Sequence, residues 1–187
     1  MYNIYLEKIY TKKFGHSDDV KSLGWGSSIS QQLRFKVLTE IGINFQDSIL
    51  DVGCVYGDFS INFENYLGID LRLKAIDTAR QNYPSRKFQC VDIKSIEDSF
   101  DWVVASGIFC FKKNWKEITL ETLNKMWSLS NKGIAVNFLS DLSNGKREIE
   151  MKYTKPSEII NMIQPLSSKF IIRHDYLPND FTLYLYK

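Results

Sequence analysis

The stretch Ile49-Leu50-Asp51-Val52-Gly53-Cys54-Val55-Tyr56-Gly57-Asp58 decides which fold the chain should adopt. Its apolar beginning is typical of a buried strand, which we place at residues 48–52. A turn with two glycines follows, and residues 57–64 are predicted to form a short helix. In such a unit a ligand can lie against bare backbone N–H groups at the helix N-terminus. Glycine turns also follow strands without any ligand, so the rest of the chain has to support this interpretation.

Strand-like and helix-like segments alternate along the rest of the chain. Further helices are expected at residues 27–42, 72–82, 115–129 and 156–163, and further strands at 66–69, 87–91, 101–106, 134–139, 170–174 and 181–186. The first of these helices should bury the apolar positions between Ile29 and Ile41. Helices between strands imply parallel strands, and the hairpin formed by the last two strands implies one antiparallel strand near an edge. We therefore predict an α/β fold: a seven-stranded, mostly parallel sheet with helices on both faces.

The length and composition of the chain are those of one globular domain. Of its 187 residues, 44% are hydrophobic and 25% are charged, which suits one full core rather than two. We divide this domain into an N-terminal extension with a helix (1–42), a cofactor-binding core (46–140) and a substrate-side part (141–187) that begins with a polar loop at 141–153. A formal net charge of +2, without a Lys/Arg block, argues against a nucleic-acid partner.

The cysteines and the apolar segments indicate a compartment for the chain. Cys54, Cys90 and Cys110 are odd in number and widely spaced, which argues against a disulfide framework and a zinc site and fits a reducing environment. The N-terminal residues 1–14 lack the apolar core of a secretory signal, and no stretch approaches the roughly 18 apolar residues of a membrane span. We expect a cytoplasmic protein without a metal or a membrane partner, and the oligomeric state stays open.

Two further acids follow the next two predicted strands. Asp70 comes roughly 20 residues after Asp51, where an acid can accept hydrogen bonds from both hydroxyls of a ribose. Asp92 ends the strand after that one, and Ser106 follows the fourth. Ligands of open α/β sheets bind outside the carboxyl ends of the strands, so we expect these side chains to converge on one crevice. Taken singly, each acid would also be compatible with an ordinary surface position.

In this order and spacing, residues 48–139 resemble the class I S-adenosylmethionine-dependent methyltransferases. The resemblance implies a Rossmann-like fold, methyl transfer, and S-adenosyl-L-methionine as the cofactor. It assigns the methionine part of the cofactor to Asp51, Gly53 and Cys54, with Gly57 opening the helix. It assigns the ribose to Asp70, the adenine to Leu71, Asp92 and the backbone of Ile93, and the methionine end also to Ser106, Gly107 and Ile108.

One departure from the family pattern is Val55, which stands where the family commonly has glycine. Because a β-branched residue disfavours positive φ, we expect this turn to be locally different and the affinity for the cofactor to be reduced. A nicotinamide cofactor is the weaker alternative, since it would need Gly-x-Gly-x-x-Gly for close approach to a pyrophosphate and that spacing is absent.

The N-terminal extension offers further candidate contacts to the cofactor. In many methyltransferases of this class such an extension folds over the cofactor, which would make Trp25 a lid residue and bring Arg34 or Gln31 to the cofactor carboxylate. Each has an alternative without a ligand. Trp25 would anchor the extension, Arg34 would lie on a solvated face, and Gln31 would form a capping box with Ser28.

The methyl acceptor is narrowed mainly by what the chain lacks. The residues after the fourth strand are Ser106-Gly107-Ile108-Phe109 rather than the Asn/Asp-Pro-Pro-Tyr of amino-methylating nucleic-acid enzymes. A small-molecule, sugar or peptide-like acceptor is therefore favoured, methylated on oxygen or nitrogen. RNA, protein, or a catalytically silent cofactor-binding scaffold are the alternatives.

A general base is needed where the acceptor must lose a proton. His174 is the leading candidate, and His16 is a second one. A purely structural histidine that pairs with a neighbouring Asp or Tyr is the alternative for His174. We expect the acceptor to lie between Phe109, the loop at 141–153 and His174.

Overall fold

The computed structural model describes residues 28–144 and 147–187. Its elements in chain order are α2 (Ser28–Thr39), β1 (Ile49–Val52), η2 (Asp58–Asn62), β2 (Tyr66–Asp70), α3 (Leu73–Asn82), β3 (Lys87–Cys90), η3 (Ile93–Ser95), β4 (Phe100–Ala105), α4 (Trp115–Leu129), β5 (Ser130–Leu139), α5 (Pro156–Ile163), β6 (Phe170–Arg173) and β7 (Asp180–Tyr186), where η denotes a 3-10 helix. Trp25 and His16 lie outside the described residues.

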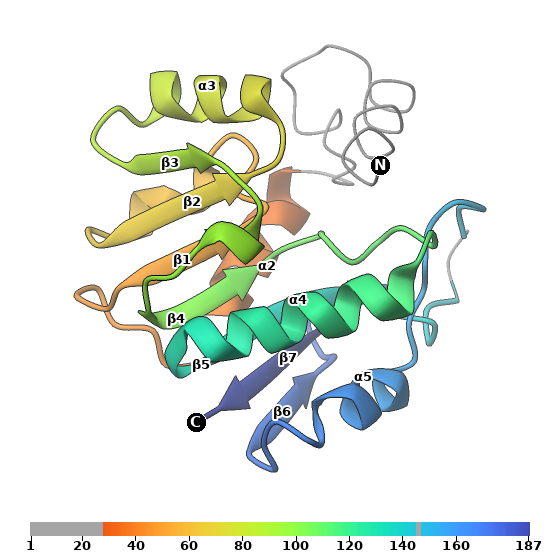
Figure 1. Ribbon diagram of the computed structural model, residues 1–187. Helices are drawn as coiled ribbons and strands as arrows, with labels where there is room; N and C mark the ends of the chain where they lie inside the picture. The colour runs from red at the N-terminus through yellow and green to blue at the C-terminus, as the bar shows by residue number, and fades with distance from the viewer. Residues whose placement is uncertain (1–27, 145–146) are drawn as a thin grey trace.

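The strands form one seven-stranded sheet in the order β3-β2-β1-β4-β5-β7-β6 (Figure 1). β1 pairs in parallel with β2 and β4, and the outer neighbours β3 and β5 continue this direction. β7 is antiparallel to both β5 and β6, and residues 174–179 join the last two strands as a hairpin. The predicted α/β class, with one antiparallel strand near an edge, is confirmed.

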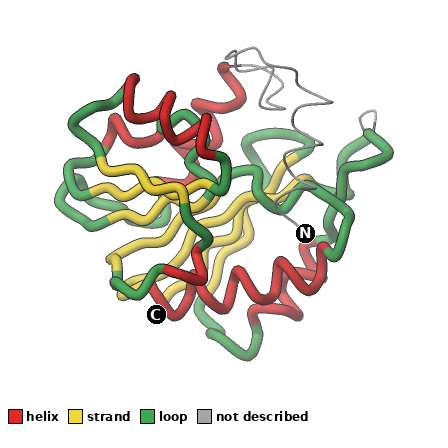
Figure 2. The backbone as a smooth tube through the Cα atoms, turned by 45° about the horizontal axis from the view of Figure 1, so that its top comes forward, coloured by secondary structure: helices red, strands yellow, loops and turns green. Residues whose placement is uncertain are grey.

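Helices cover both faces of the sheet (Figure 2), because alternate strand residues point to opposite sides. On one face Leu50 belongs to a core cluster that includes Met126 of α4 and Ile159 of α5. On the other face Ile49 belongs to a cluster with Leu38 of α2 and Ile76 of α3. All six of these side chains are almost completely buried. The sheet is therefore the middle layer of three, and its strand ends remain available at two edges.

Some boundaries differ from those expected. The helix expected at residues 57–64 is a short 3-10 helix that begins after Gly57, whose φ of 82° lies outside the helical region. β5 starts at Ser130, earlier than expected, because its first residue already pairs with Phe100 of β4. Ile29 is 76% exposed, so the expectation that it belongs to the buried face of the first helix is wrong.

At the amino-end edge of the sheet, polar side chains bind one another. The Lys132 ammonium donates to Asp47 at 2.6 Å and lies 3.3 Å from an Asp101 oxygen. The indole Nε1 of Trp102 donates to Asp47 at 2.8 Å, and the backbone N–H of Ser48 donates to Asp101 at 2.9 Å. Burial raises the pKa of Asp47, but the hydrogen bonds outweigh it and the pKa is lowered. The hydrogen bonds from Ser48 and Lys132 likewise lower the pKa of Asp101.

Candidate functional site

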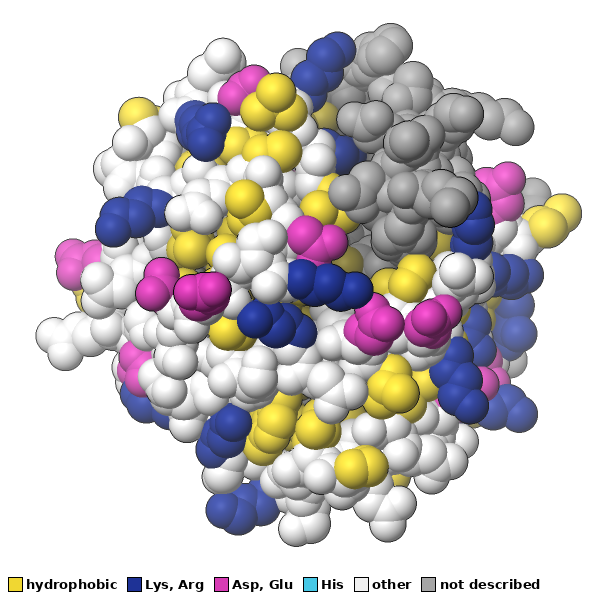
Figure 3. Space-filling view, in the orientation of Figure 1, with side chains coloured by type: hydrophobic (Ala, Val, Ile, Leu, Met, Phe, Trp, Pro, Cys, Tyr) yellow, Lys and Arg dark blue, Asp and Glu magenta, His cyan; other side chains and the backbone are white. Residues whose placement is uncertain are grey.

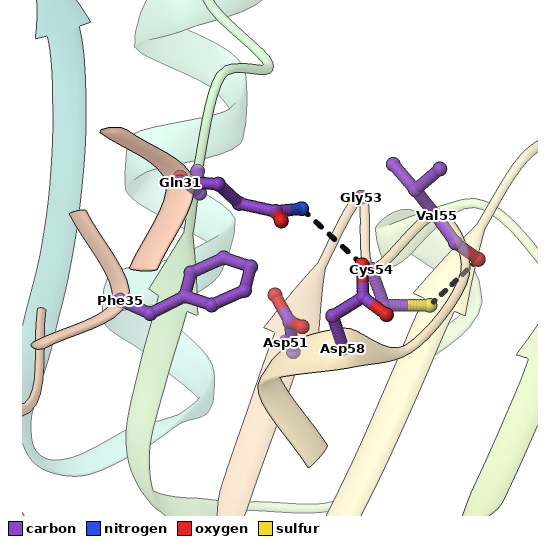
Figure 4. Close-up of a pocket in the computed structure, with 8 residues that line it drawn as sticks. Gln31, Phe35, Asp51, Gly53, Cys54, Val55 and Asp58 are labelled. Atoms are coloured by element: carbon purple, nitrogen blue, oxygen red, sulfur yellow. Dashed lines mark hydrogen bonds between the residues drawn. The ribbon is translucent and has the colours of Figure 1, made fainter. Parts of the chain in front are cut away.

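A pocket lies at the opposite edge, where the parallel strands end (Figure 4). Helix α2, strand β1 with the turn that follows it, and the segment after β4 contribute its walls. The lining residues are Gln31, Phe35, Asp51, Gly53, Cys54, Val55, Asp58 and Ser106. The sequence analysis had assigned Asp51, Gly53, Cys54 and Ser106 to the cofactor, and the structure brings these four together.

Two glycines of the turn are required by close contacts. Gly53 has a φ of 78°, and a Cβ there would lie 2.4 Å from Cγ2 of Ile108. Gly57 has a φ of 82°, and a Cβ there would lie 2.6 Å from the Phe88 ring. Any larger residue would push the turn away from the strand ends. The two glycines therefore fix the shape of this pocket wall.

Val55 adopts a φ of 50°, within the left-handed region that favours glycine. The expectation that its branched side chain would force a locally different turn is therefore wrong. A non-glycine residue in this region costs on the order of 1–3 kcal/mol. The surrounding contacts hold it there: its backbone N–H donates to the Asp70 carboxylate at 3.2 Å. The turn keeps its glycine-like path under strain.

The backbone N–H groups of this turn are already used within the protein. Those of Gly53 and Cys54 both donate to the carbonyl of Ile69, at 2.8 and 3.0 Å, and that of Val55 donates to Asp70. The parallel strand β2 thus supplies the acceptors of these three groups. The prediction of bare N–H groups concerned the start of the following helix at Asp58, and it stays a prediction.

Asp51 is a buried carboxylate at the base of the pocket. The Tyr66 hydroxyl donates to it at 2.6 Å. Burial raises its pKa to about 7, the Tyr66 hydrogen bond opposes this rise, and the neighbouring carboxylates of Asp70 and Asp58 add to it. Near neutral pH this group is therefore poised between its protonated and ionised forms, and a nearby positive charge would favour the ionised form.

Asp58 is a pocket residue that the sequence analysis did not assign. It accepts a hydrogen bond from Gln31 at 3.2 Å and another from the Tyr83 hydroxyl at 3.0 Å. Figure 4 shows Gln31 and Phe35 reaching from α2 toward Asp51 and Asp58. The side chain of Gln31 thus takes part in the pocket wall rather than in a capping box. The position of Asp58 directly after Gly57 was the available sequence signal.

Asp70 lies beside the pocket wall, at the end of β2. Its carboxylate accepts from the backbone N–H of Arg72 at 2.9 Å and from the Arg72 side chain at 3.2 Å, besides the bond from Val55. Asp70 is 8% exposed. It therefore also positions the glycine turn, a role that the sequence analysis did not foresee.

The residues assigned to the adenine lie further along the same sheet edge. The Asp92 carboxylate accepts from the backbone N–H of Lys94 at 2.9 Å and so caps η3. Leu71 is half-buried, and its carbonyl lies 3.6 Å from the Cys90 sulfur. Ile93 is buried in the core cluster. None of the three lines the pocket described above, so their assignment stays a prediction.

The segment after β4 is held by Asn137 of β5. The Asn137 Oδ1 accepts from the backbone N–H of Gly107 at 2.8 Å, and its Nδ2 donates to the Ser106 hydroxyl at 2.9 Å. Gly107 has a φ of 75°, which suits glycine. The half-buried Ile108 occupies the space that a side chain at Gly53 would need. Asn137 was not singled out in the sequence, since nothing local marks it.

Arg34 does not line the pocket, although its neighbours on α2 do. Its guanidinium forms an ion pair with Asp180 of β7, and both side chains are buried. The alternative of a solvated Arg34 is therefore wrong. The pair ties α2 to the sheet and thereby supports the wall formed by Gln31 and Phe35.

His174 directly follows β6, and β6 ends at the same edge of the sheet as the parallel strands. Its Nε2 lies 2.6 Å from the hydroxyl of Ser140, and its ring stacks on Phe181 at 6.4 Å between centroids. The expected structural pairing with Asp or Tyr is replaced by one with serine. Phe109 is only 3% exposed and stacks on Phe138, so it belongs to the core and does not face an open acceptor site.

Known proteins are similar to this chain in both sequence pattern and fold. Residues 50–125 match a family model described as a methyltransferase domain. Magnesium protoporphyrin IX methyltransferase from Synechocystis PCC 6803 with bound SAM superposes with a TM-score of 0.72 at 13% identity, over 99% of this chain and 96% of that chain. N-methyltransferase NodS from Bradyrhizobium japonicum does so with a TM-score of 0.63 at 13% identity, over 87% and 99%. No curated protein matches the chain.

Residues 50–125 are therefore a methyltransferase domain, and the sheet that carries them has the fold of the class I, S-adenosylmethionine-dependent methyltransferases. The predicted family, fold class and enzyme class are confirmed, and S-adenosylmethionine is the cofactor that belongs with them. Within residues 28–144 and 147–187, no helix is both long and apolar enough to cross a membrane.

Proposed function

We propose that the chain transfers the methyl group of S-adenosylmethionine to an oxygen or nitrogen atom of a small-molecule, sugar or peptide-like acceptor. The observation that carries the proposal is the pair Asp51 and Asp58, two carboxylates on one pocket. Among the described residues, no lysine or arginine is hydrogen-bonded to either of them. Such a pocket favours a cationic ligand, and the cofactor carries a sulfonium and an ammonium group.

The residues of the pocket suit the amino-acid end of this cofactor. Asp51 and Asp58 would hold its positive groups, and Ser106 would contact its polar end. Asp70 would accept from the ribose, and Asp92 would lie toward the adenine, as the family resemblance implies. The cofactor supplies an activated methyl group, and the protein mainly aligns the acceptor and excludes water.

The class of acceptor is supported by the net charge and by one similar protein. On the face shown in Figure 3, basic and acidic side chains alternate over the middle of the molecule, and several basic side chains gather at its right margin. The formal net charge of the chain is only +2, which does not favour a nucleic-acid backbone. The acceptor of the similar Synechocystis methyltransferase, magnesium protoporphyrin IX, is a small molecule. RNA and protein acceptors are outcomes of the test below.

Binding and turnover measurements test the proposal. Calorimetry should detect S-adenosylmethionine and S-adenosylhomocysteine but not NAD. Transfer of a labelled methyl group should then be compared for a metabolite extract, total RNA and a protein mixture, with Asp51→Asn as the matched control. Labelling in the metabolite extract is expected. Labelling of RNA or protein alone would show that the acceptor is a macromolecule and contradict the proposed acceptor class. Binding without turnover would indicate a catalytically silent scaffold.

His174 is the proposed general base for acceptors that must lose a proton. It sits beside Ser140, at the end of β5, where the carboxyl ends of the strands meet. His174→Ala should lower turnover by roughly 10²–10⁴. The affinity for S-adenosylhomocysteine should stay unchanged, with Ser140→Ala as the comparison. An unfolded variant would mean a structural histidine, and normal turnover would mean catalysis by alignment alone.

A further inference from the structure

The amide of Asn137 has only one possible orientation. It lies between the backbone N–H of Gly107, at 2.8 Å, and the hydroxyl of Ser106, at 2.9 Å. A backbone N–H can only donate, so the amide oxygen must face Gly107 and the amide nitrogen must face Ser106. Asn137 is 3% exposed, and no rearrangement toward water is open to it at this position in β5.

This orientation fixes the role of the Ser106 hydroxyl. Its oxygen accepts the hydrogen bond from Asn137, so its own proton must point elsewhere. Ser106 lines the pocket, and within the described part of the chain no residue accepts that proton. The N–H groups of Gly53, Cys54 and Val55 are already used. The Ser106 hydroxyl can therefore donate a hydrogen bond to an acceptor atom of a ligand in the pocket.

We propose that Asn137 is a positioning residue that turns the Ser106 proton toward a carboxylate of the ligand. This inference rests on the proposed function, because the only anionic group at the amino-acid end of S-adenosylmethionine is its carboxylate. Asp51 and Asp58 line the same pocket and would bind the positive groups of the same end, so the pocket would recognise both charges of the zwitterion. Asn137 itself touches no ligand in this arrangement and acts only through Ser106.

The test compares two probes in four forms of the chain. The forms are the wild type, Ser106→Ala, Asn137→Asp and the double variant. An aspartate at position 137 would still accept from Gly107, but it would also accept from Ser106 and so draw the proton out of the pocket. The probes are S-adenosylhomocysteine and 5′-methylthioadenosine, which shares the adenosine and lacks the amino-acid carboxylate. Calorimetry gives the affinities, and circular dichroism shows whether each variant is folded.

Each single variant should bind S-adenosylhomocysteine about tenfold more weakly than the wild type, as expected for losing a hydrogen bond to a charged group. Both should bind 5′-methylthioadenosine as the wild type does. In the Ser106→Ala background, Asn137→Asp should add less than about threefold, since the two changes remove the same bond.

Three results would overturn the inference. Equal losses for both probes would mean that Asn137 and Ser106 merely shape the pocket. Independent losses in the double variant would mean that Asn137 acts without Ser106. Unchanged affinity in folded Ser106→Ala would mean that the proton is not used, and this single variant suffices if Asn137→Asp does not fold. Failure of the wild type to bind S-adenosylhomocysteine would instead contradict the proposed function.

Discussion

The two edges of the sheet place carboxylates in opposite surroundings. At the amino-end edge, Asp47 is bound by Lys132 and by the Trp102 indole, and its pKa is lowered. At the carboxyl-end edge, Asp51 is bound by a neutral tyrosine and lies near Asp58, and its pKa is raised to about 7. Both carboxylates are similarly buried, at 6% and 5% exposure. Burial raises the pKa of both groups; at Asp51 it is the dominant cause, whereas at Asp47 the hydrogen bonds and the Lys132 ammonium outweigh it.

This difference separates a stabilising cluster from a candidate binding site. A buried carboxylate with a cation and hydrogen-bond donors favours the folded state. A buried carboxylate beside other carboxylates destabilises the fold when it ionises. Its ionised form is stabilised only when a ligand brings a positive charge close to it. Perturbed carboxylates of this kind are frequent at functional sites. The same sheet thus has one edge adapted for folding and another that fits a cationic ligand.

The largest effect is expected from Asp51→Asn. This variant keeps the shape of the side chain but removes the charge that would hold the cationic cofactor. Binding of S-adenosylmethionine should weaken by about a hundredfold. At the same time the variant should be more stable than the wild type at pH 8, because the ionised buried carboxylate is gone. Calorimetry and thermal unfolding measure the two effects, and Asp101→Asn at the other edge should leave binding unchanged.

The pH dependence of stability sharpens the same contrast. The pKa of Asp51 is raised on folding to about 7 from an ordinary value of 3.8, so between these values the folded state holds a proton that the unfolded state has lost. The free energy of unfolding should therefore fall as pH rises through this window, and Asp51→Asn should remove that fall. Binding of S-adenosylmethionine at pH 7 should release a fraction of a proton. Identical pH profiles for variant and wild type would show that Asp51 ionises normally.

Asp70→Ala should weaken the binding of S-adenosylhomocysteine by roughly tenfold to a hundredfold, through lost hydrogen bonds to the ribose. Part of this loss comes from the turn, since the Val55 N–H loses its acceptor. Arg72→Ala serves as the matched control, because it removes the partner of Asp70 and leaves the carboxylate in place. An unchanged dissociation constant for a folded Asp70→Ala would place the ribose elsewhere.

At the amino-end edge, Asp47→Ala should lower the free energy of unfolding by about 2 kcal/mol, because the buried Trp102 indole N–H would lose its acceptor. Cofactor affinity should not change. The loss should be greatest near neutral pH and shrink as the pH falls through the lowered pKa of Asp47, where the wild type also loses this carboxylate. Urea unfolding at several pH values measures the change in the free energy of unfolding. A change in cofactor affinity would show that the two edges do not act independently.

The smallest effect is expected from Val55→Gly. Relieving the positive φ of 50° should raise the free energy of unfolding by about 1 kcal/mol, after allowance for the greater freedom of glycine in the unfolded chain. Val55→Ala, which keeps a Cβ, should recover less of this strain. Cofactor affinity should rise modestly if the valine hinders the turn. A destabilised Val55→Gly would show that the packing of the valine side chain outweighs its backbone strain.

Local pattern was sufficient to predict the sheet, its antiparallel strand and four of the residues in the pocket. The sequence predicts that the Asp-x-Gly turn and the acid after the next strand lie near each other. The reason is that parallel strands bring their carboxyl ends to one edge of the sheet. Gly53 and Gly57 also indicated the path of the turn in the sequence, because both have positive φ values that other residues rarely adopt.

Contacts across the chain were decided by the tertiary structure alone. Phe35 reaches the pocket because α2 packs against the far face of the sheet, and Asn137 meets Ser106 because β5 lies beside β4. Val55 keeps a glycine-like φ because Asp70 binds its N–H. The raised pKa of Asp51 depends on burial and on the Asp70 and Asp58 carboxylates that the fold brings near it. Sequence spacing identifies which groups come to one edge of a sheet, whereas their partners, orientation and charge depend on which surfaces pack together.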